Sequence, residues 1–466
     1  MKKIPLIILV FTILLSACSG GSQKSETTES KTMFTGAKGE VKLMTLDPGH
    51  FHAALVQKTM LEQIDPMVHI YAPEGPELEG HMNLINSYNN RNDDPTSWET
   101  KIYTGPDYLE KMLSEKPGNV MVTAGNNAKK TDYILKTVDA GINVLADKPM
   151  VISPGEFPKL EKAFQVAEEK GVLLYDIMTE RYEITTILQR EMSMIPEVFG
   201  TLVNGTADEP AITKESVHHF FKYVSGSPLK RPPWFFDVEQ QGEGIVDVTT
   251  HLVDLIQWEA FPEVVLKKED VEIVSASRWT TDLTPDMFKK ATQLDEYPDY
   301  LQKDIENGTL KVYSNGEINY KLKGVHAKVS VIWNFEAPEG TGDTHYSIMR
   351  GTKCNLTIKQ GEKEGYKPQL YIEANPDVDL MEFAGYLYNA VQDLSSKYPG
   401  LKLKKLDENR WMVEIPEKFK VGHEAHFGQV AEKYLGFLVQ GSMPGWEVPN
   451  MIVKYYTIME GMKAAM

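Results

Sequence analysis

A short segment in the middle of the chain combines carboxylates and a histidine at helical spacing. It begins with Gly242-Glu-Gly, and Asp247, His251 and Asp254 then stand at positions i, i+4 and i+7. A helix would place these three side chains on one face. A carboxylate one turn before a histidine can hold the imidazole tautomer, which suits a general base. Because the same spacing is common in surface ion pairs, a structural role stays open.

An ammonium group follows a short apolar run earlier in the chain. Residues 143–150 read Asn-Val-Leu-Ala-Asp-Lys-Pro-Met, so Asp147 and Lys148 end a predicted strand. Parallel α/β sheets bind ligands at the carboxyl ends of their strands. Lys148 is therefore a candidate to contact substrate and cofactor, and Asp147 is a candidate cofactor contact. An ordinary strand end is the alternative interpretation.

The turn after the first predicted strand matches a dinucleotide-binding fingerprint only in part. That fingerprint reads Gly-x-Gly-x-x-Gly, because the backbone must turn tightly and approach a diphosphate. Asp47 takes the first glycine position, Gly49 the second and His52 the third. A turn without a ligand is the alternative. The candidate cofactor contacts outside the strand end at 147–148 are Asp47, Gly49, His50, Phe51, His52 and Asn126.

The elements that must position these residues follow from the apolar pattern. Up to residue 178, short apolar runs alternate with helical patterns, which is typical of a parallel sheet covered by helices. The predicted strands are 41–46, 68–71, 119–123, 143–146 and 172–176, the predicted helices are 53–64, 129–140 and 158–170, and the polar segment 75–98 is predicted as loop. Beyond residue 181, strand-like stretches follow one another without regular helices, until the predicted helices 425–440 and 448–466 close the chain.

These patterns predict two domains. Residues 40–180 are expected to form an α/β Rossmann-type domain with a doubly wound parallel sheet. Residues 181–466 are expected to form an α+β domain with a mixed or antiparallel sheet and C-terminal helices, for substrate binding and oligomerisation. The length of 466 residues agrees with more than one domain.

The N-terminus has the features of a bacterial lipoprotein signal. Lys2 and Lys3 precede an apolar run at 4–15, which is shorter than the ~20 residues that a spanning helix needs. The run ends in Leu-Ser-Ala-Cys, which resembles a lipobox with Cys18 as the lipidated residue. Residues 1–18 are thus a predicted signal peptide and 19–39 a flexible linker. We expect a membrane-anchored lipoprotein that faces the periplasm or the cell exterior.

Charge limits the partners of the chain. A formal net charge of -17 repels nucleic acid and anionic membrane surfaces, so a neutral substrate fits better and the membrane is contacted only through the lipid anchor. The sequence predicts no metal site. The pairs His218-His219 and His423 with His426 lack a cysteine or carboxylate pattern that would complete one.

Taken together, the segments resemble the Gfo/Idh/MocA family of sugar dehydrogenases. Residues 147–149 resemble its Glu-Lys-Pro signature, 122–127 its Thr-Pro-Asn segment, and 242–254 its glycine-rich turn with Asp-x-x-x-His. The departures are aspartate for glutamate at 147, Gly125 for proline and Lys129 for histidine.

The resemblance implies that NAD or NADP takes a hydride from a carbinol carbon of a carbohydrate or polyol. His251 would be the general base, Asp247 would orient it, and Lys148 would hold the hydroxyl. The resemblance also implies a homo-oligomer. The implied substrate contacts are Arg181, Lys222, Trp234 and Asp254, with Arg231 nearby.

An exported protein meets no large free pool of nicotinamide cofactor, so three hypotheses remain open. In the first, the cofactor is tightly bound and regenerated on the protein, including through a redox-neutral cycle on a glycoside. In the second, the fold has lost its cofactor and is a glycan-binding module. In the third, the protein is a dehydrogenase that uses a soluble cofactor, and the targeting signal has been misread.

Overall fold

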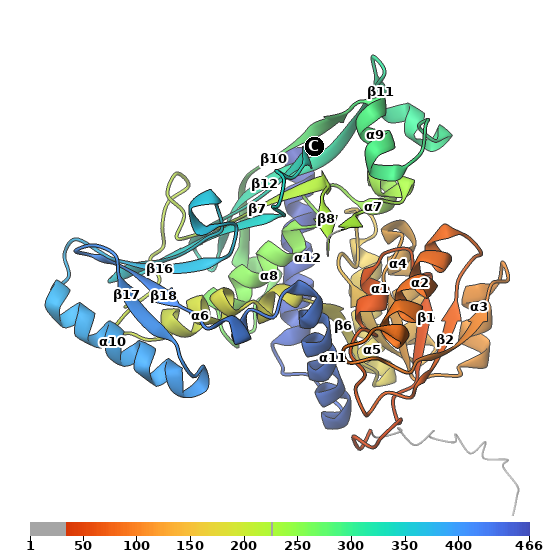
Figure 1. The fold of residues 1–466 in the computed structure, drawn as a ribbon, viewed down its shortest axis with the longest axis horizontal. Coiled ribbons are helices and arrows are strands. Elements are labelled where there is room, and N and C mark those ends of the chain that lie inside the picture. Colours follow the sequence, from red (N-terminus) through yellow and green to blue (C-terminus); the bar gives the residue numbers. More distant parts are fainter. Residues whose placement is uncertain (1–33, 225–226) are drawn as a thin grey trace, which may run out of the picture. The chain divides into compact units, whose positions relative to one another are not determined.

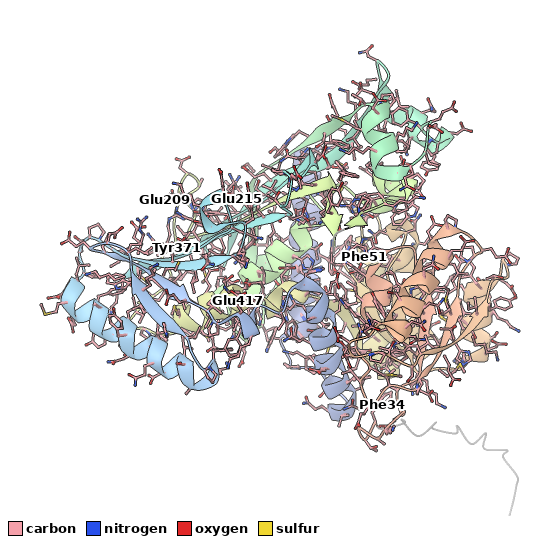
Figure 2. All side chains as sticks on the ribbon, in the orientation of Figure 1. Phe34, Phe51, Glu209, Glu215, Tyr371 and Glu417 are labelled. Atoms are coloured by element: carbon pink, nitrogen blue, oxygen red, sulfur yellow. The ribbon has the colours of Figure 1, made fainter. Side chains whose placement is uncertain are left out.

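The computed structural model describes residues 34–224 and 227–466. The predicted signal peptide, Cys18 and most of the predicted linker lie outside these residues. The end of the linker is folded, however, because Phe34 packs against the core and the Glu40 carboxylate accepts hydrogen bonds from the amides of Thr35, Gly36 and Ala37. The folded body therefore includes residues from Phe34, which is labelled in Figure 2, and does not start at residue 40 as predicted.

The first sheet has six parallel strands in the order β3-β2-β1-β4-β5-β6. Strands β1, β2 and β6 are labelled in Figure 1. Its strands are β1 (Leu43–Leu46), β2 (Met67–Tyr71), β3 (Glu99–Tyr103), β4 (Val120–Thr123), β5 (Asn143–Asp147) and β6 (Leu174–Ile177). The connecting helices are α1 (His52–Leu55), α2 (Pro76–Asn90), α3 (Tyr108–Glu115), α4 (Asn127–Asp139) and α5 (Phe157–Lys170). Strands β1, β4 and β6 are buried throughout, and β5 is buried from Val144 to Asp147, as strands covered on both faces must be. The order reverses between β1 and β4, where folds of this type open a crevice.

The second sheet is mixed, with ten strands in the order β10-β12-β13-β7-β14-β15-β16-β18-β17, and β11 paired with β12. Its strands are β7 (Ile212–Phe221), β10 (Val271–Leu283), β11 (Ile305–Glu306), β12 (Thr309–Leu322), β13 (Val325–Glu336), β14 (Thr344–Arg350), β15 (Cys354–Lys359), β16 (Gln369–Ala374), β17 (Lys402–Lys405) and β18 (Arg410–Glu414), and β8 (Tyr223–Val224) pairs separately with β9 (Ser227–Pro228). Only β13 and β7 run parallel, which confirms the predicted mixed sheet.

Helices join the two sheets. The helices after β6 are α6 (Ile184–Ser193), α7 (Val238–Gln241), α8 (Thr249–Ala260), α9 (Pro285–Thr292), α10 (Leu380–Lys397), α11 (His423–Gln440) and α12 (Glu447–Ala465). The chain returns to the first sheet at its end, since α11 packs on α1 and β6, and α12 contacts α5, α8 and β10. Among residues 34–224 and 227–466, every helix is too short or too polar to span a bilayer.

Two sequence predictions in the first part of the chain were wrong. The predicted helix 53–64 is a single turn, α1, because the next carbonyls are used elsewhere: Gln57 accepts from the Trp98 indole and Lys58 from Arg91. The predicted loop 75–98 contains the helix α2. Its apolar stripe was hidden among polar residues and consists of Leu78, His81, Ile85 and Tyr88, all buried at helical spacing.

Candidate active site

A large cavity opens between the carboxyl ends of β1 and β5 and the second sheet. Its volume is about 1080 Å³. It is unusually rich in imidazole, because seven of the eleven histidines line it: His50, His52, His218, His251, His345, His423 and His426. Phe51, labelled in Figure 2, belongs to the same wall and extends from the loop after β1.

An ion pair in this cavity joins the end of β5 to the segment that precedes α8. Lys148, at the end of β5, donates to Asp247 Oδ1 with Nζ at 2.5 Å, and both side chains are about nine-tenths buried. Gln241 Nε2 donates to the other oxygen of Asp247 at 3.1 Å. Asp247 was predicted to orient His251, and this contact is not formed. Because α8 begins only at Thr249, Asp247 precedes the helix and points instead to Lys148.

The imidazole of His251 lines the cavity that holds this ion pair. Its Nδ1 is buried and has no hydrogen-bond partner in the described part of the chain. Burial, together with the charges of Lys148 and His423, holds the pKa of His251 well below its usual value. A neutral imidazole at this position can accept a proton.

Two predicted substrate residues contribute to a buried ion cluster and do not line the cavity. Arg181 donates to both oxygens of Asp254, at 2.6 and 2.7 Å, and to Glu447 at 3.1 Å. Lys454 completes the cluster between Asp254, at 2.9 Å, and Asp176, at 2.6 Å. The guanidinium of Arg181 is fully used by carboxylates that burial would otherwise leave unpaired, so Arg181 and Asp254 have a structural role.

Lys222 does line the cavity, next to residues that the sequence did not indicate. It forms an ion pair with Asp343, whose carboxylate also lies 3.0 Å from His218 and 3.3 Å from His219. Burial would raise the pKa of Asp343, but His218, His219 and Lys222 hold it well below its usual range. No sequence pattern links Asp343, in the connection before β14, to the two histidines on β7, so only pairing of these strands could reveal the cluster.

The turn after β1 does not have the features of a diphosphate site. The Asp47 carboxylate points across the crevice, where it accepts a hydrogen bond from Tyr133 at 2.8 Å and lies 3.5 Å from the Lys129 ammonium. The amide of Gly49 donates to the backbone oxygen of Asp47 and that of His50 to the backbone oxygen of Ala124, so these amides are not free for an anion. Helix α1 has one turn, and its dipole is correspondingly weak.

Two further predicted contacts at this crevice are occupied by the protein itself. A Cβ atom on Gly49 would lie 3.4 Å from the ring of Trp234, so this buried indole covers the backbone that a diphosphate would approach. Asn126 caps α4 and donates to Gln240 at 2.7 Å. We conclude that Asp47, Gly49 and Asn126 do not fit the diphosphate of NAD or NADP, and that Trp234 is a packing residue and not a substrate contact.

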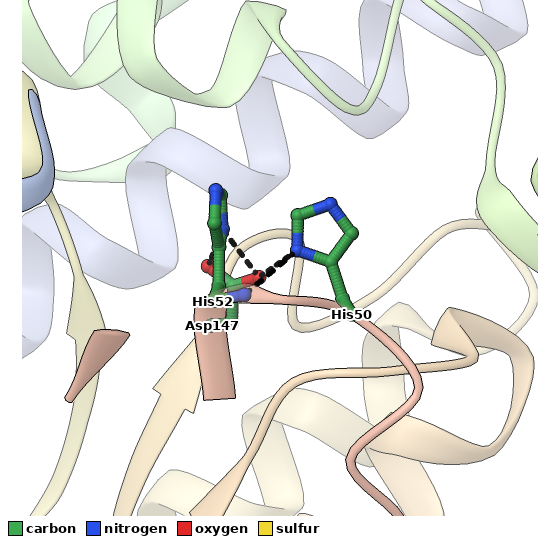
Figure 3. A group of neighbouring side chains, drawn as sticks. All are labelled: His50, His52 and Asp147. Atoms are coloured by element: carbon green, nitrogen blue, oxygen red, sulfur yellow. Dashed lines mark hydrogen bonds and ion pairs between the residues drawn. The ribbon is translucent and has the colours of Figure 1, made fainter. Parts of the chain in front are cut away.

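The other residues of the turn converge on the end of β5. His52 Nδ1 lies 3.0 Å from Asp147 Oδ2, and His50 Nδ1 lies 3.9 Å from the same oxygen (Figure 3). The three residues form a group with the spacing of metal ligands, which the sequence did not predict. Burial holds the pKa of both His50 and His52 well below the usual value, so both imidazoles are neutral at pH 7.

The fold and this cavity define a two-sheet α/β protein with a large pocket at the strand ends of its first sheet. Residues 188–466 match the family described as "Putative oxidoreductase C terminal domain", and the chain belongs to this family. It is 57% identical to a "putative oxidoreductase" from Parabacteroides merdae, whose crystal structure superposes with a TM-score of 0.91 over 93% of this chain and 99% of that one. Comparison with curated proteins gave no match.

More distant solved structures share the fold. Levoglucosan dehydrogenase, in complex with NADH and levoglucosan, is 12% identical, with a TM-score of 0.56 over 91% of this chain and 97% of that one. A 3-ketoreductase from Actinomadura kijaniata, in complex with NADP and TDP-benzene, is 11% identical, with a TM-score of 0.54 over 91% and 97%. The predicted architecture, a Rossmann-type parallel sheet followed by a mixed sheet, is thus confirmed.

Proposed function

We propose that this protein is an oxidoreductase that acts on a neutral carbohydrate or polyol in the imidazole-rich cavity. The observation that carries the proposal is the ion pair between Lys148, directly after β5, and Asp247, before α8, in the cavity that also holds the neutral imidazole of His251. A neutral base, an ammonium that can stabilise an alkoxide and a carboxylate that positions the ammonium line a space large enough for a sugar, and this combination suits the oxidation of a hydroxyl.

Each of the three groups has a distinct role in this proposal. Oxidation of a carbinol transfers a hydride from the carbon to an acceptor and releases the hydroxyl proton, and the neutral imidazole of His251 is the base that would accept this proton. The Lys148 ammonium would donate a hydrogen bond to the same oxygen and stabilise its alkoxide character. Asp247 would keep the ammonium in position and acts as a positioning residue.

A nicotinamide cofactor is the hydride acceptor that the fold family implies, and structural neighbours were solved with NADH or NADP. Because the turn from Asp47 to Gly49 does not fit a diphosphate, we derive no step through NAD or NADP. The same observation favours a second candidate function, which is a cofactor-free module that binds a glycan in this cavity.

A product assay distinguishes the two candidates. The protein is incubated with neutral sugars and polyols, with and without added NAD or NADP, and mass spectrometry records loss of two hydrogens from the sugar. Lys148→Ala and His251→Ala should abolish product formation, while Lys162→Ala, an exposed lysine on α5, should not. Full activity in the first two variants would contradict the site.

A second measurement tests cofactor retention directly. The purified protein is denatured and the supernatant is assayed for nicotinamide dinucleotides. A stoichiometric amount would support the tightly bound cofactor and show that the turn rearranges. Sugar binding by calorimetry with no product and no dinucleotide under any condition would favour the glycan-binding module.

We further propose that the chain is an exported lipoprotein, anchored through Cys18 and facing the periplasm or the cell exterior, and that it forms a homo-oligomer without nucleic acid partners. The support is the Leu-Ser-Ala-Cys segment after an apolar run and the net charge of -17. Growth with a radioactive fatty acid should label the native protein, and the label should be absent from Cys18→Ser. Retained labelling in that variant would contradict the anchor, and a monomer in light scattering would contradict the oligomer.

A further inference from the structure

The two histidines after β1 and the aspartate at the end of β5 direct three donor atoms to one point. His50 and His52 flank Phe51, so a tight turn brings both rings towards Asp147, and the three donor atoms lie within 4.8 Å of one another (Figure 3). A tetrahedral ion with bonds of 2.0–2.2 Å has ligand atoms about 3.4 Å apart. The distances to Asp147 Oδ2, 3.0 Å from His52 Nδ1 and 3.9 Å from His50 Nδ1, lie on either side of that spacing.

A simple hydrogen bond explains only half of this arrangement. His52 Nδ1 is within hydrogen-bond distance of Asp147, but His50 Nδ1 at 3.9 Å is not. The contact that His50 Nδ1 does make is a long one, from the amide of His52 at 3.4 Å. A shared ion between the rings and the carboxylate accounts for both orientations.

The surroundings hold the ligands in place. The amide of His50 donates to Ala124 at 3.0 Å, which fixes the turn against β4. Lys130 Nζ donates to the backbone oxygen of Asp147 at 2.9 Å and fixes the strand end. The nearby Lys148 ammonium is neutralised by Asp247, so its charge opposes a cation only weakly.

Two imidazoles and one carboxylate with open positions are the donor set of catalytic zinc sites and of non-haem iron(II) sites. We propose that His50, His52 and Asp147 bind a divalent transition metal ion of the Zn²⁺ class, with its remaining coordination positions open to the cavity. All three residues line that cavity, so an open position would face the substrate. The turn that does not fit a diphosphate is thus the turn that supplies two metal ligands.

The ion would extend the chemistry of the cavity. This role rests on the proposed function: an oxygen of the carbohydrate would occupy an open position and be polarised next to Lys148. The metal site itself needs only His50, His52 and Asp147, and metal binding can be measured whether or not the protein turns over a sugar.

Titration of the full chain with Zn²⁺ and Co²⁺ tests the site. After treatment with a chelator, we expect one equivalent of Zn²⁺ by calorimetry and one of Co²⁺ with visible d–d absorption bands. His50→Gln, His52→Gln and Asp147→Asn should each weaken Zn²⁺ at least ~100-fold, the upper end of what a change in a ligand's own partners costs. His218→Gln, which alters another histidine of the cavity, should bind as the wild type.

Unaltered Zn²⁺ affinity in His50→Gln, or no saturable binding by the wild type, would overturn the proposal. If the variants fail to fold, a protection experiment on the wild-type protein still tests the metal site. Bound Zn²⁺ should protect His50 and His52, but not His218, from acylation by diethyl pyrocarbonate, as mapped by mass spectrometry, and equal acylation with and without Zn²⁺ would overturn it. His251→Ala should keep the metal, so an inactive chain that binds Zn²⁺ separates failure of the function from failure of the site.

Discussion

Removal of the Lys454 ammonium should destabilise the protein more than any surface charge on the same helix. Its Nζ lies 2.6 Å from Asp176 and 2.9 Å from Asp254, and its side chain is 0% exposed. In Lys454→Met, Asp176 would lose its buried cation, and Asp254 and Glu447 would share the guanidinium of Arg181. Loss of one partner from a buried ion pair costs roughly 3–5 kcal/mol, because the remaining charges stay buried without compensation.

Lys463 is a matched control, because it is a lysine on the same helix, α12, whose ion pair is exposed to solvent. It pairs with Glu460 at 2.6 Å, but its side chain is 53% exposed. Such pairs contribute roughly 0–1 kcal/mol, so Lys463→Met should differ little from the wild type. Guanidinium unfolding followed by tryptophan fluorescence and circular dichroism gives both values. Equal stability of Lys454→Met and the wild type within ~1 kcal/mol would refute the reasoning, as would an equal loss in Lys463→Met.

Low pH should weaken the same ion cluster and so destabilise the protein. Burial would raise the pKa of Asp254, yet Arg181 and Lys454 hold it well below the usual range. A carboxylate with a depressed folded pKa adds stability above its unfolded pKa of ~4, and this is lost as the pH falls through the folded value. With one cation removed, the loss should begin at higher pH in Lys454→Met. Melting temperatures measured from neutral pH down to about pH 3 would reveal that shift.

Three further predictions concern buried groups away from the cavity. Burial lowers the pKa of His81 to about 4, so its neutral ring favours folding above ~6.5 and this contribution is lost as the pH falls towards 4. His81→Leu should flatten the fall in melting temperature over that window, and an unchanged slope would contradict this. Burial raises the pKa of the Cys354 thiol to about 12, so in the Cys18→Ser chain a thiol reagent at mildly alkaline pH should label it only after denaturation. Gly244→Ala would put a Cβ 1.6 Å from the Ser314 carbonyl and should cost 1–3 kcal/mol or more, whereas Gly80→Ala, in open space on α2, should stabilise by about 0.5–1 kcal/mol; denaturant midpoints in the reverse order would contradict both.

The fold class was predictable because it depends on patterns that a sequence displays locally. The short apolar runs at 120–123 and 144–146 are buried on both faces, and the alternation in 324–333 is typical of a strand in the second sheet. The secondary structure was predicted wrongly where contacts with residues distant in the sequence outweighed the local helix preference. Helix 53–64 was cut short by hydrogen bonds to Trp98 and Arg91, and α2 has only four buried positions in a polar segment.

The candidate site was predictable only where one segment carried the whole signal. The sequence by itself determined that Asp147 and Lys148 stand at a strand end and that His251 lies on a helix, since each depends on its neighbours in the chain. Only the tertiary structure decided which groups meet: Asp247 with Lys148, Arg181 with Asp254, and His50 and His52 with Asp147. The physical reason is that ion pairs and ligand sets depend on distances of a few ångströms between strands, and burial then determines which charges must be paired.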